Sequence, residues 1–591
     1  MTKKHENSGL TPVLDPFEAG RQWLDIAIKA QDIMTQYVNR QMSGGFAQAA
    51  AQPDPTVIGR LFASLLSDPG KLGHAQFSFW NEHASLWHRV LNARGQPDIP
   101  PSKDRRFKNE DWQKNIALNS LMHSYLIGAN WLRSLIANQT GLSSSDKKEL
   151  TFYTEQLIDA TAPTNFAATN PDVIRKTLET GGTNILKGFS NFLDDLSVNA
   201  GHIRRADPKA FELGVNIATA KGSVVLRTDL MELIQYEPTT ENVRSVPVLL
   251  VPPWVNKYYL FDLQKKSSFI QWLVDQGYTV FAISWVNPDK SHARKDFESY
   301  WTEGPLAALD AIEKATGQKN VNLFSYCLGG TLAATGLAYL ADLNDDRISS
   351  ATMVATMTDF TDFGDFEVFV KEQSVQTLDE NLKGKGYLSS ADLSSLFSLL
   401  RANDLIWSSA ISSYLLADKA VASDLLYWFS DGIGMPAKML DTFMRVILMD
   451  NALVKPGQFK IAGVPIDLTS IRTPLCFVSL KDDHVAHWQA TYKGAYQFKA
   501  PKRFILGGSG HNAGTISPPS AGKHGFWTNE SFPEDPDAWL EGAERQEGSW
   551  WTDWSVWLEK HSGPEIPARP VAGGPLAVLT SAPGDYVRVR R

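Results

Sequence analysis

The stretch from Asn320 to Leu340, NVNLFSYCLGGTLAATGLAYL, constrains the fold of this chain more than any other. It begins with a short apolar run of strand composition, turns tightly around Cys327 and continues as an Ala/Leu-rich run of helical composition. A strand, a sharp turn and a helix with a nucleophile at the apex is how several sheet enzymes expose a catalytic side chain. The alternative is a small buried cysteine in an ordinary turn, since free cysteine is often a core residue. This stretch alone leaves both interpretations open.

The turn departs from the usual G-x-S-x-G pattern of such a nucleophile elbow at two positions. Cys327 stands where the serine nucleophile is usual, and Ser325 stands where the first glycine is expected. Small residues are needed there because the turn is strained and neighbouring backbones pass close by. We therefore expect Ser325 to strain the elbow slightly.

Strands and helices alternate on both sides of the elbow. Buried strands are predicted at 246–253, 278–288, 348–357, 473–480 and 503–511, with helices of ten to fifteen residues between them. This alternation predicts a parallel sheet with helices on both faces and the elbow strand near its middle. Together with the elbow it predicts the α/β-hydrolase fold.

The remaining sequence divides into three regions. Residues 1–205 read as a helical N-terminal domain, with apolar faces at Trp23–Val38, Phe77–Leu91 and Ile116–Ile136 that we interpret as core. Residues 206–591 form the catalytic domain, and the alternation stops at about 359–463, where a helical cap or lid insertion is expected. The four tryptophans of WWTDWSVW (Trp550, Trp551, Trp554 and Trp557) favour a helix packed on the sheet over a face that contacts polymer.

Two further side chains complete a triad in the order that this fold uses, which is nucleophile, acid and histidine. Asp483 follows the strand TPLCFVSL, and His511 follows RFILGGSG. All three residues lie after the carboxyl ends of predicted strands, where open α/β sheets bind ligands. Asp482 is a rival for the acid, and His484 and His487 are rivals for the base. We prefer His511 because the two rival histidines lie in the acid loop.

A cysteine nucleophile favours thioester chemistry. The thiolate is the reactive form, and a helix N-terminus and a neighbouring imidazole both favour it. We expect His511 to take the thiol proton, and the backbone N–H groups of Leu328 and Val255 to form the oxyanion hole. An acyl-cysteine is itself a thioester, so the acyl group stays activated for attack by an alcohol.

Composition excludes several classes of function. The formal net charge of -8 argues against a general nucleic-acid binder. Only two cysteines are present, which fits a reducing compartment, and no uncharged apolar run approaches the length of a membrane span. The N-terminal twenty residues lack the apolar core of a signal peptide. We expect a cytosolic protein without a metal or cofactor.

The chain resembles the class I polyhydroxyalkanoate synthases over nearly its whole length. The resemblance rests on the stretches RFKNEDW, PTNFAATNP, ELIQYEPTT, VPPWVNKYYLFDL, SWVNPD, YCLGG, LRANDLIW, DDHVAHW and GSGHNAG. It implies a helical N-terminal domain followed by an α/β-hydrolase domain with a cap. It places Cys327, Asp483 and His511 on the catalytic positions of the family. Phe429 stands where the family usually has asparagine, and His487 where it usually has proline.

The resemblance also implies the reaction and the partners. The family polymerises (R)-3-hydroxyacyl-CoA, here expected to be the short-chain 3-hydroxybutyryl-CoA, and releases CoA. His511 would activate Cys327, and Asp483, directly or through His511, would activate the 3-hydroxyl group. The CoA thioester is a substrate rather than a cofactor. The expected partners are the growing polyester, a second copy of the chain in a homodimer, the granule surface and granule-coating proteins, in the cytoplasm.

Two other functions remain open. A cysteine hydrolase of the same fold, such as an intracellular polyester depolymerase or thioesterase, would release free hydroxy acid. A non-catalytic granule-associated interaction protein could use the tryptophan-rich surface, although a complete triad is unexpected there.

Overall fold

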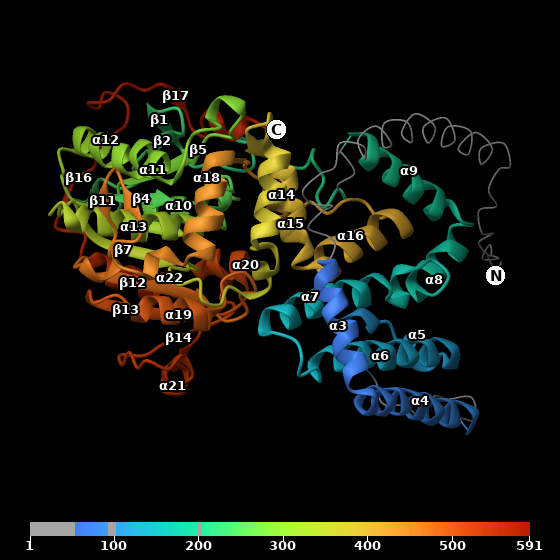
Figure 1. Cartoon of the computed structure of the whole chain (residues 1–591). Coiled ribbons are helices and arrows are strands. Elements are labelled where there is room, and N and C mark those ends of the chain that lie inside the picture. Colours follow the sequence, from blue (N-terminus) through green and yellow to red (C-terminus); the bar gives the residue numbers. More distant parts are fainter. Residues whose placement is uncertain (1–53, 93–101, 199–202, 591) are drawn as a thin grey trace, which may run out of the picture. The chain divides into compact units, whose positions relative to one another are not determined.

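The computed structural model describes residues 54–92, 102–198 and 203–590. The chain forms two compact units (Figure 1). The first comprises Met1–Arg205 and Ser395–Val421, and the second comprises Ala206–Ser394 and Ala422–Arg591. The apolar face predicted at Trp23–Val38 lies outside the described residues.

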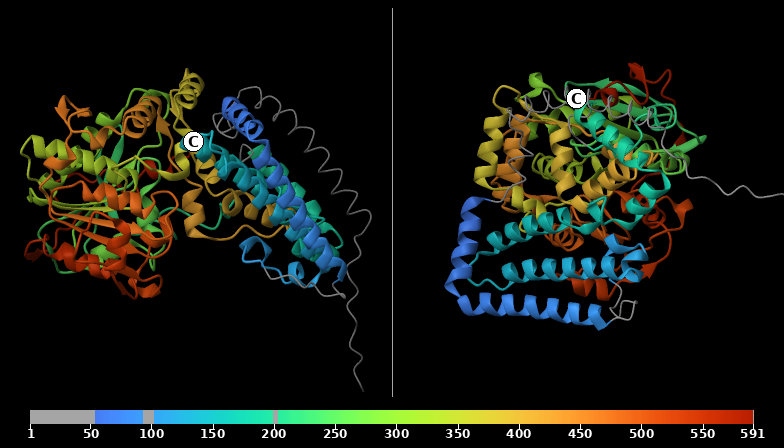
Figure 2. Two further views of the ribbon diagram at one scale, coloured as in Figure 1. Left: turned by 60° about the horizontal axis from the view of Figure 1, so that its bottom comes forward. Right: turned by 90° about the vertical axis from the view of Figure 1, so that its right-hand side faces the viewer.

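The first unit is built from helices over its described residues. They are α3 (Pro55–Ser67), α4 (Pro69–Asn92), α5 (Asp111–Lys114), α6 (Ile116–Ala137), α7 (Ser144–Ala160), α8 (Pro171–Glu179) and α9 (Thr183–Val198), with short 3-10 turns at Arg105–Phe107 and Pro163–Asn165. The side chains of Asp54, Asn115, Ser143 and Asn170 cap four of these helices by accepting backbone N–H groups. α4 and α6 include the predicted stretches Phe77–Leu91 and Ile116–Ile136, so both predicted helices are confirmed. Figure 2 shows α4, α6 and α7 side by side.

Part of the segment expected to form the cap belongs to this first unit. It includes the end of α15 (Ser390–Leu399), η7 (Asn403–Trp407), α16 (Ser408–Ala410) and η8 (Ile411–Leu415). Asn184 Nδ2 donates to the carbonyl oxygen of Leu415 at 2.8 Å, and Asn191 Nδ2 donates to that of Ser413 at 3.0 Å. These bonds from α9 satisfy carbonyl groups near the end of the last helical turn, where helices lack internal partners.

The second unit is organised around one sheet of eleven strands. The spatial order is β15-β14-β13-β12-β7-β6-β4-β5-β2-β1-β17. The strands are β1 (Gly222–Arg227), β2 (Met231–Tyr236), β4 (Val248–Val251), β5 (Val280–Trp285), β6 (Val321–Tyr326), β7 (Ile348–Val354), β12 (Leu475–Leu480), β13 (Lys502–Gly507), β14 (Phe526–Thr528), β15 (Glu544–Gln546) and β17 (Thr580–Ser581). In Figure 1 the labelled strands of this sheet follow one another in this spatial order, from β1 through β2, β5, β4, β7, β12 and β13 to β14.

The middle of this sheet is parallel, as the sequence predicts. β13, β12, β7, β6, β4 and β5 pair in parallel, whereas every pair outside this run is antiparallel. β6 is the sixth of the eleven strands, and all of its residues are buried. The predicted position of the elbow strand near the middle of the sheet is therefore confirmed. The antiparallel pairing of the strands at both edges of the sheet was not predicted from the sequence.

Helices cover this sheet and close its core. They include α10 (Phe269–Asp275), α11 (Phe297–Trp301), α12 (Ala307–Thr316), α13 (Leu328–Asp342), α19 (Trp488–Tyr496), α20 (His511–Thr515), α21 (Pro536–Glu541) and α22 (Trp550–Glu559). All four tryptophans of α22 are buried, and Trp551 and Trp554 are fully inaccessible. The interpretation of this helix as core is confirmed, because such large apolar side chains stabilise mainly through burial.

The rest of the cap segment lies in the second unit. Its elements are η6 (Gly364–Phe369), α14 (Glu372–Leu382), α17 (Asp424–Phe429), α18 (Ala437–Thr442) and η9 (Phe443–Met449), with short strand pairs β8 (Tyr387–Leu388) with β9 (Met435–Pro436) and β10 (Lys460–Ile461) with β11 (Val464–Pro465). Arg445 binds Glu372 at 2.7 Å and Asp379 and Asp441 at 2.9 Å each. One guanidinium thus joins η9 to α14 and α18.

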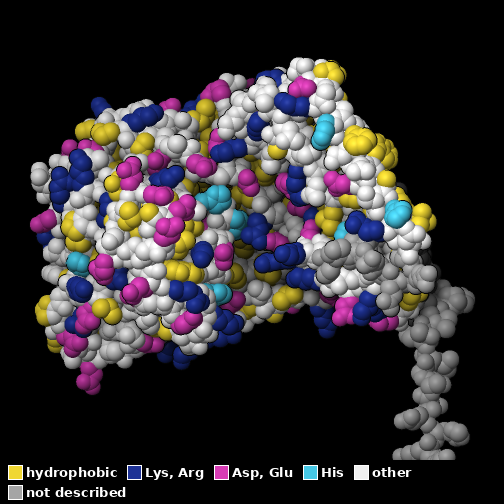
Figure 3. All heavy atoms as spheres, turned by 90° about the horizontal axis from the view of Figure 1, so that it is seen from below, with side chains coloured by type: hydrophobic (Ala, Val, Ile, Leu, Met, Phe, Trp, Pro, Cys, Tyr) yellow, Lys and Arg dark blue, Asp and Glu magenta, His cyan; other side chains and the backbone are white. Residues whose placement is uncertain are grey.

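On the face shown in Figure 3, acidic, basic and apolar side chains are interspersed. Among the described residues, no helix has both the length and the apolar character that crossing a membrane requires.

Candidate active site

Cys327 lies at the apex of a strained turn between β6 and α13. Its backbone has φ 51° and ψ -124°, a conformation that residues with a side chain rarely adopt. Two backbone hydrogen bonds maintain this strained conformation. The Cys327 N–H donates to the carbonyl oxygen of Val354 at 2.9 Å, and the Cys327 carbonyl oxygen accepts the N–H of Gly330 at 2.9 Å. The thiol therefore sits at the N-terminus of a fifteen-residue helix and remains partly exposed.

Glycines after the nucleophile are required by close packing. A Cβ atom on Gly329 would lie 2.3 Å from the carbonyl oxygen of Val251, and one on Gly330 would lie 1.9 Å from Thr356 Oγ1. Ser325 is accommodated without a comparable conflict: it is fully buried, and its hydroxyl donates to the Thr352 carbonyl oxygen at 2.9 Å. Its side chain thus gains a partner on β7, which offsets the cost of burying a polar group.

Asp483 and His511 form a buried pair at the carboxyl ends of β12 and β13. His511 Nδ1 lies 2.6 Å from Asp483 Oδ2. The second oxygen, Oδ1, accepts the backbone N–H groups of Val485 at 2.8 Å and Ala486 at 2.9 Å. The carboxylate side chain is fully inaccessible, so all of its contacts are with the protein. Such a carboxylate fixes the orientation and tautomer of the imidazole.

The rival residues differ from this pair in their exposure. Asp482 is exposed on the same loop, and its backbone N–H donates to the carbonyl oxygen of Ser509 at 3.0 Å. His484 is half-buried and His487 is exposed, whereas His511 is buried. Of these candidates, Asp483 and His511 are the two that the structure brings together.

The pKa values of this pair are strongly coupled. Burial alone would lower the pKa of His511, but the charges of Asp483 and Cys327, and side-chain hydrogen bonds with both, raise it to about 10. Burial would raise the pKa of Asp483, but the charge and hydrogen bond of His511 and two backbone N–H groups lower it below its ordinary value. Near neutral pH, the imidazole therefore holds a proton beside the Asp483 carboxylate.

Two residues beside the triad were not singled out by the sequence. Tyr326 directly precedes the nucleophile, and its hydroxyl donates to Asn512 Oδ1 at 2.7 Å. Asn512 directly follows His511, and the Tyr326 ring lies 5.1 Å from the imidazole, centroid to centroid. The elbow and the histidine turn are thus joined. The only signal in the sequence was a polar aromatic residue at the end of an apolar strand.

The two groups predicted for the oxyanion hole lie at the ends of neighbouring strands. Leu328 is the first residue of α13, where helices leave backbone N–H groups without internal partners. Val255 is buried in the turn after β4, which pairs with β6. The Val255 carbonyl accepts the N–H of Ile433 at 3.0 Å, so this turn is bonded to the cap segment.

His487 and Phe429, which differ from the residues usual in the resembled family, both fit their local backbone and packing. His487 is the N-cap residue of α19, and its φ of -51° is close to the value that proline would impose. The start of this helix is therefore compatible with either residue. Phe429 ends α17 and packs against the main core of the second unit.

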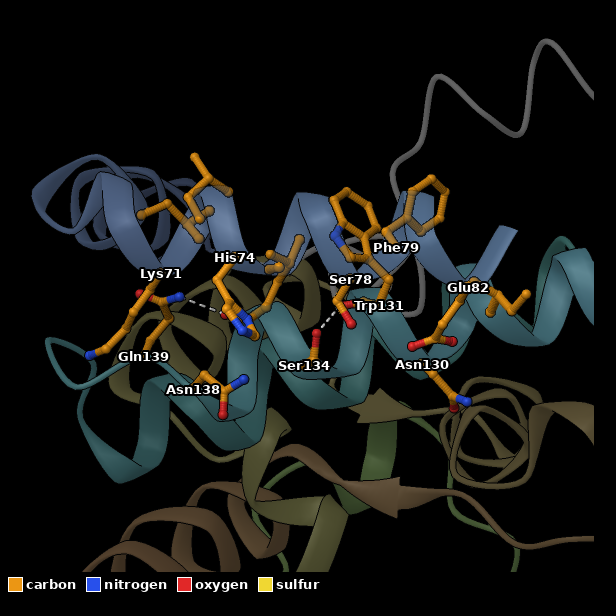
Figure 4. Close-up of a pocket in the computed structure, with 15 residues that line it drawn as sticks. Lys71, His74, Ser78, Phe79, Glu82, Asn130, Trp131, Ser134, Asn138 and Gln139 are labelled. Carbon is orange, nitrogen blue, oxygen red and sulfur yellow. Dashed lines mark hydrogen bonds between the residues drawn. The ribbon is translucent and has the colours of Figure 1, made fainter. Parts of the chain in front are cut away.

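The cavity of about 540 Å³ shown in Figure 4 lies between α4 and α6 of the first unit. Lys71, His74, Ser78, Glu82 and Trp131 are among the residues that line it. None of the residues predicted for catalysis contributes to it, and we assign it no chemistry.

Comparisons with known proteins agree on the fold and the family. A profile described as "Poly-beta-hydroxybutyrate polymerase (PhaC) N-terminus" matches residues 103–273, and one described as "alpha/beta hydrolase fold" matches residues 247–515. The α/β-hydrolase fold predicted from the sequence is therefore confirmed.

Several curated relatives match most of the chain. The "Poly(3-hydroxyalkanoate) polymerase subunit PhaC" of Rhizobium meliloti is 39% identical, over 89% of this chain and 87% of that protein. The "Poly(3-hydroxyalkanoate) polymerase" of Methylorubrum extorquens is 39% identical, over 93% and 92%. The Cupriavidus necator subunit is 35% identical, over 93% and 94%.

Proposed function

The chain belongs to the poly(3-hydroxyalkanoate) polymerase family, and we propose that it carries out this polymerisation through a covalent acyl intermediate on Cys327. The protein is an acyltransferase that joins the acyl groups of hydroxyacyl-CoA into polyhydroxyalkanoate and releases CoA. The observation that carries the covalent mechanism is the buried His511–Asp483 pair, whose imidazole is electrostatically coupled to Cys327 at the head of α13.

In the first half-reaction, the Cys327 thiolate attacks the thioester carbonyl carbon. The oxyanion is stabilised by the N–H groups of Leu328 and Val255, and removing one such donor typically costs a factor of about 10²–10³ in rate. The bond to the CoA sulfur then breaks, and protonated His511 gives its proton to the departing thiolate. The product is an acyl-Cys327 thioester with nearly the energy of the substrate.

In the second half-reaction, neutral His511 takes the proton of a 3-hydroxyl group, whose oxygen attacks the acyl-Cys327 carbonyl. An ester bond forms and Cys327 leaves as the thiolate. Both carboxylate oxygens of Asp483 are already bonded within the protein, which favours an orienting role through His511 over direct contact with the hydroxyl. Because each step exchanges an activated acyl group, we propose that the reaction needs no metal and no cofactor.

The substrate we propose is (R)-3-hydroxybutyryl-CoA, and the test is to mix it with pure protein and follow free thiol. We expect rapid CoA release, a product of high molecular mass, and an acyl adduct on Cys327 by mass spectrometry after a brief mix. Release no faster than that by Cys327→Ala would overturn the proposal. A product consisting only of free hydroxy acid would instead indicate the hydrolase.

We propose further that the protein works as a homodimer at the surface of polyester granules in the cytoplasm, together with granule-coating proteins. The insolubility of the product supports this, since a chain that grows from Cys327 keeps the enzyme attached to it. Sedimentation of the protein with polyester granules, compared for wild type and Cys327→Ala, separates tethering from surface binding. Protein that stays in the supernatant in both cases would refute granule association.

A further inference from the structure

Lys257 is a buried lysine that takes no part in the steps of the proposed reaction. Its side chain is 1% exposed, and its Nζ lies 2.8 Å from Asp431 Oδ1. The same nitrogen donates to the carbonyl oxygens of Val587 at 2.6 Å and Val589 at 3.1 Å. The three hydrogens of the ammonium group are thus matched by three acceptors.

Asp431 is equally well satisfied. Its side chain is 5% exposed, and its Oδ2 accepts the hydroxyl of Tyr259 at 2.9 Å. Arg590 Nε lies 3.3 Å from Oδ1. Replacing a buried ion pair by apolar residues of similar volume is often neutral or stabilising. A pair like this one is therefore weak evidence for a role in stability alone.

The position of the pair indicates what it fixes. Lys257 lies two residues after Val255, whose N–H is the proposed second oxyanion donor. The Lys257 carbonyl accepts Trp428 Nε1 at 2.7 Å, and Asn256 forms an antiparallel bridge with Gly432. The turn after β4 is therefore bonded to residues 428–433 of the cap segment through its backbone, and to Val587 and Val589 through the Lys257 side chain.

We propose that Lys257 is a positioning residue, which fixes the turn bearing the Val255 N–H by binding Asp431 and the carbonyl groups of Val587 and Val589. This inference rests on the proposed function, because it assigns the second oxyanion donor to that turn. It explains why a charged network is kept where apolar packing would suffice: hydrogen bonds set the position of a backbone more narrowly than apolar contacts do.

The test compares Lys257→Met, which keeps the alkyl stem, with the control Arg347→Met. Arg347 forms a comparable ion pair, with a side chain 13% exposed, beside the first residue of β7 and far along the strand from its catalytic end. For each variant, CoA release from 3-hydroxybutyryl-CoA gives kcat and KM, and iodoacetamide alkylation of Cys327 reports the thiolate without using the oxyanion hole.

We expect Lys257→Met to lower kcat about tenfold or more, since complete loss of one donor costs about 10²–10³. KM and the alkylation rate should stay within about twofold of wild type, and Arg347→Met should match wild type in all three. A kcat within twofold of wild type would overturn the inference. So would a parallel fall in turnover and alkylation, which indicates general damage to the site.

Two further measurements keep the inference testable. Should Lys257→Met fail to fold, Asp431→Asn removes the charge at the same size and should give the same split between turnover and alkylation. Should wild-type protein release no CoA, the proposed function fails, but amide hydrogen exchange still tests the positioning role. Residues 254–257 should exchange faster in Lys257→Met than in Arg347→Met, and equal rates would refute it.

Discussion

Replacing Asp483 by asparagine should separate the orientation of His511 from its presence. Asp483 Oδ1 accepts two backbone N–H groups and Oδ2 faces His511 Nδ1 at 2.6 Å. If the asparagine oxygen keeps the two N–H groups, its NH₂ group faces Nδ1, which must then be the unprotonated nitrogen. The proton moves to Nε2, and the imidazole can no longer accept one from a thiol or hydroxyl. If the amide flips, its NH₂ group faces two donors instead.

Both arrangements cost activity and stability. The wrong tautomer removes general-base catalysis, worth a factor of about 10²–10⁴, and we expect CoA release to fall by that factor. Loss of charge-assisted bonds costs about 1.5–3 kcal/mol each where a partner is left unsatisfied, so the free energy of unfolding should fall by a few kcal/mol. The pKa of His511 should also fall from about 10, since Asp483 is the chief group that raises it.

The assay is CoA release with 3-hydroxybutyryl-CoA, together with iodoacetamide alkylation of Cys327 over a range of pH. The matched control is Asp482→Asn, one residue earlier, where the side chain is exposed. We expect the control to keep wild-type turnover and alkylation. Turnover by Asp483→Asn within tenfold of wild type, with an unchanged alkylation profile, would refute the reasoning.

Four further outcomes are expected. Gly329→Ala should give insoluble or inactive protein, since its Cβ would meet the Val251 carbonyl at 2.3 Å; soluble, active protein would contradict this contact. Ser325→Gly should lower the free energy of unfolding in urea by about 1–2 kcal/mol, through one lost hydrogen bond and glycine's extra entropy, and unchanged stability would show the bond is not formed. Because the pKa of Asp483 is lowered in the folded protein, its carboxylate stabilises the fold above about pH 4, and this stabilisation is lost as the pH falls below that value. In urea melts, Asp483→Asn should therefore lose less free energy of unfolding than wild type between pH 5 and 3. Equal losses would contradict this expectation. The raised pKa of His511 gives a contribution that is complete below about pH 6.5 and is lost as the pH rises through about 10, which the same melts measure, and a flat profile from pH 7 to 10 would count against it.

The parts of the fold that follow from local composition could be predicted from the sequence. The central strands are rich in apolar residues, which is typical of strands buried on both faces, and the small residues around Cys327 marked the elbow between β6 and α13. Asp483 and His511 could be proposed because chain order and strand ends locate them. Which of two adjacent aspartates faces the histidine was a choice that burial in the folded protein decides.

The features that depend on distant contacts could not be predicted. β14 and β15 are strands of three residues each, β14 partly buried and β15 exposed, so they carry no periodic signal. The bond between Tyr326 and Asn512 joins residues 186 positions apart. Lys257 is similar: its motif was visible, but two of its three acceptors lie more than three hundred residues away and are backbone groups, which leave no pattern in a sequence.

Residues 395–421 belong to the first unit, although the residues on both sides of them belong to the second. The polypeptide crosses between the units at 205, 394 and 421, so no single cut yields two self-sufficient fragments. A fragment beginning at Ala206 would carry a helical stretch stripped of its hydrogen-bonding partners on α9. Chimaeras that exchange the N-terminal portion between relatives should therefore exchange residues 395–421 as well, because these two segments of the chain fold together as one compact unit.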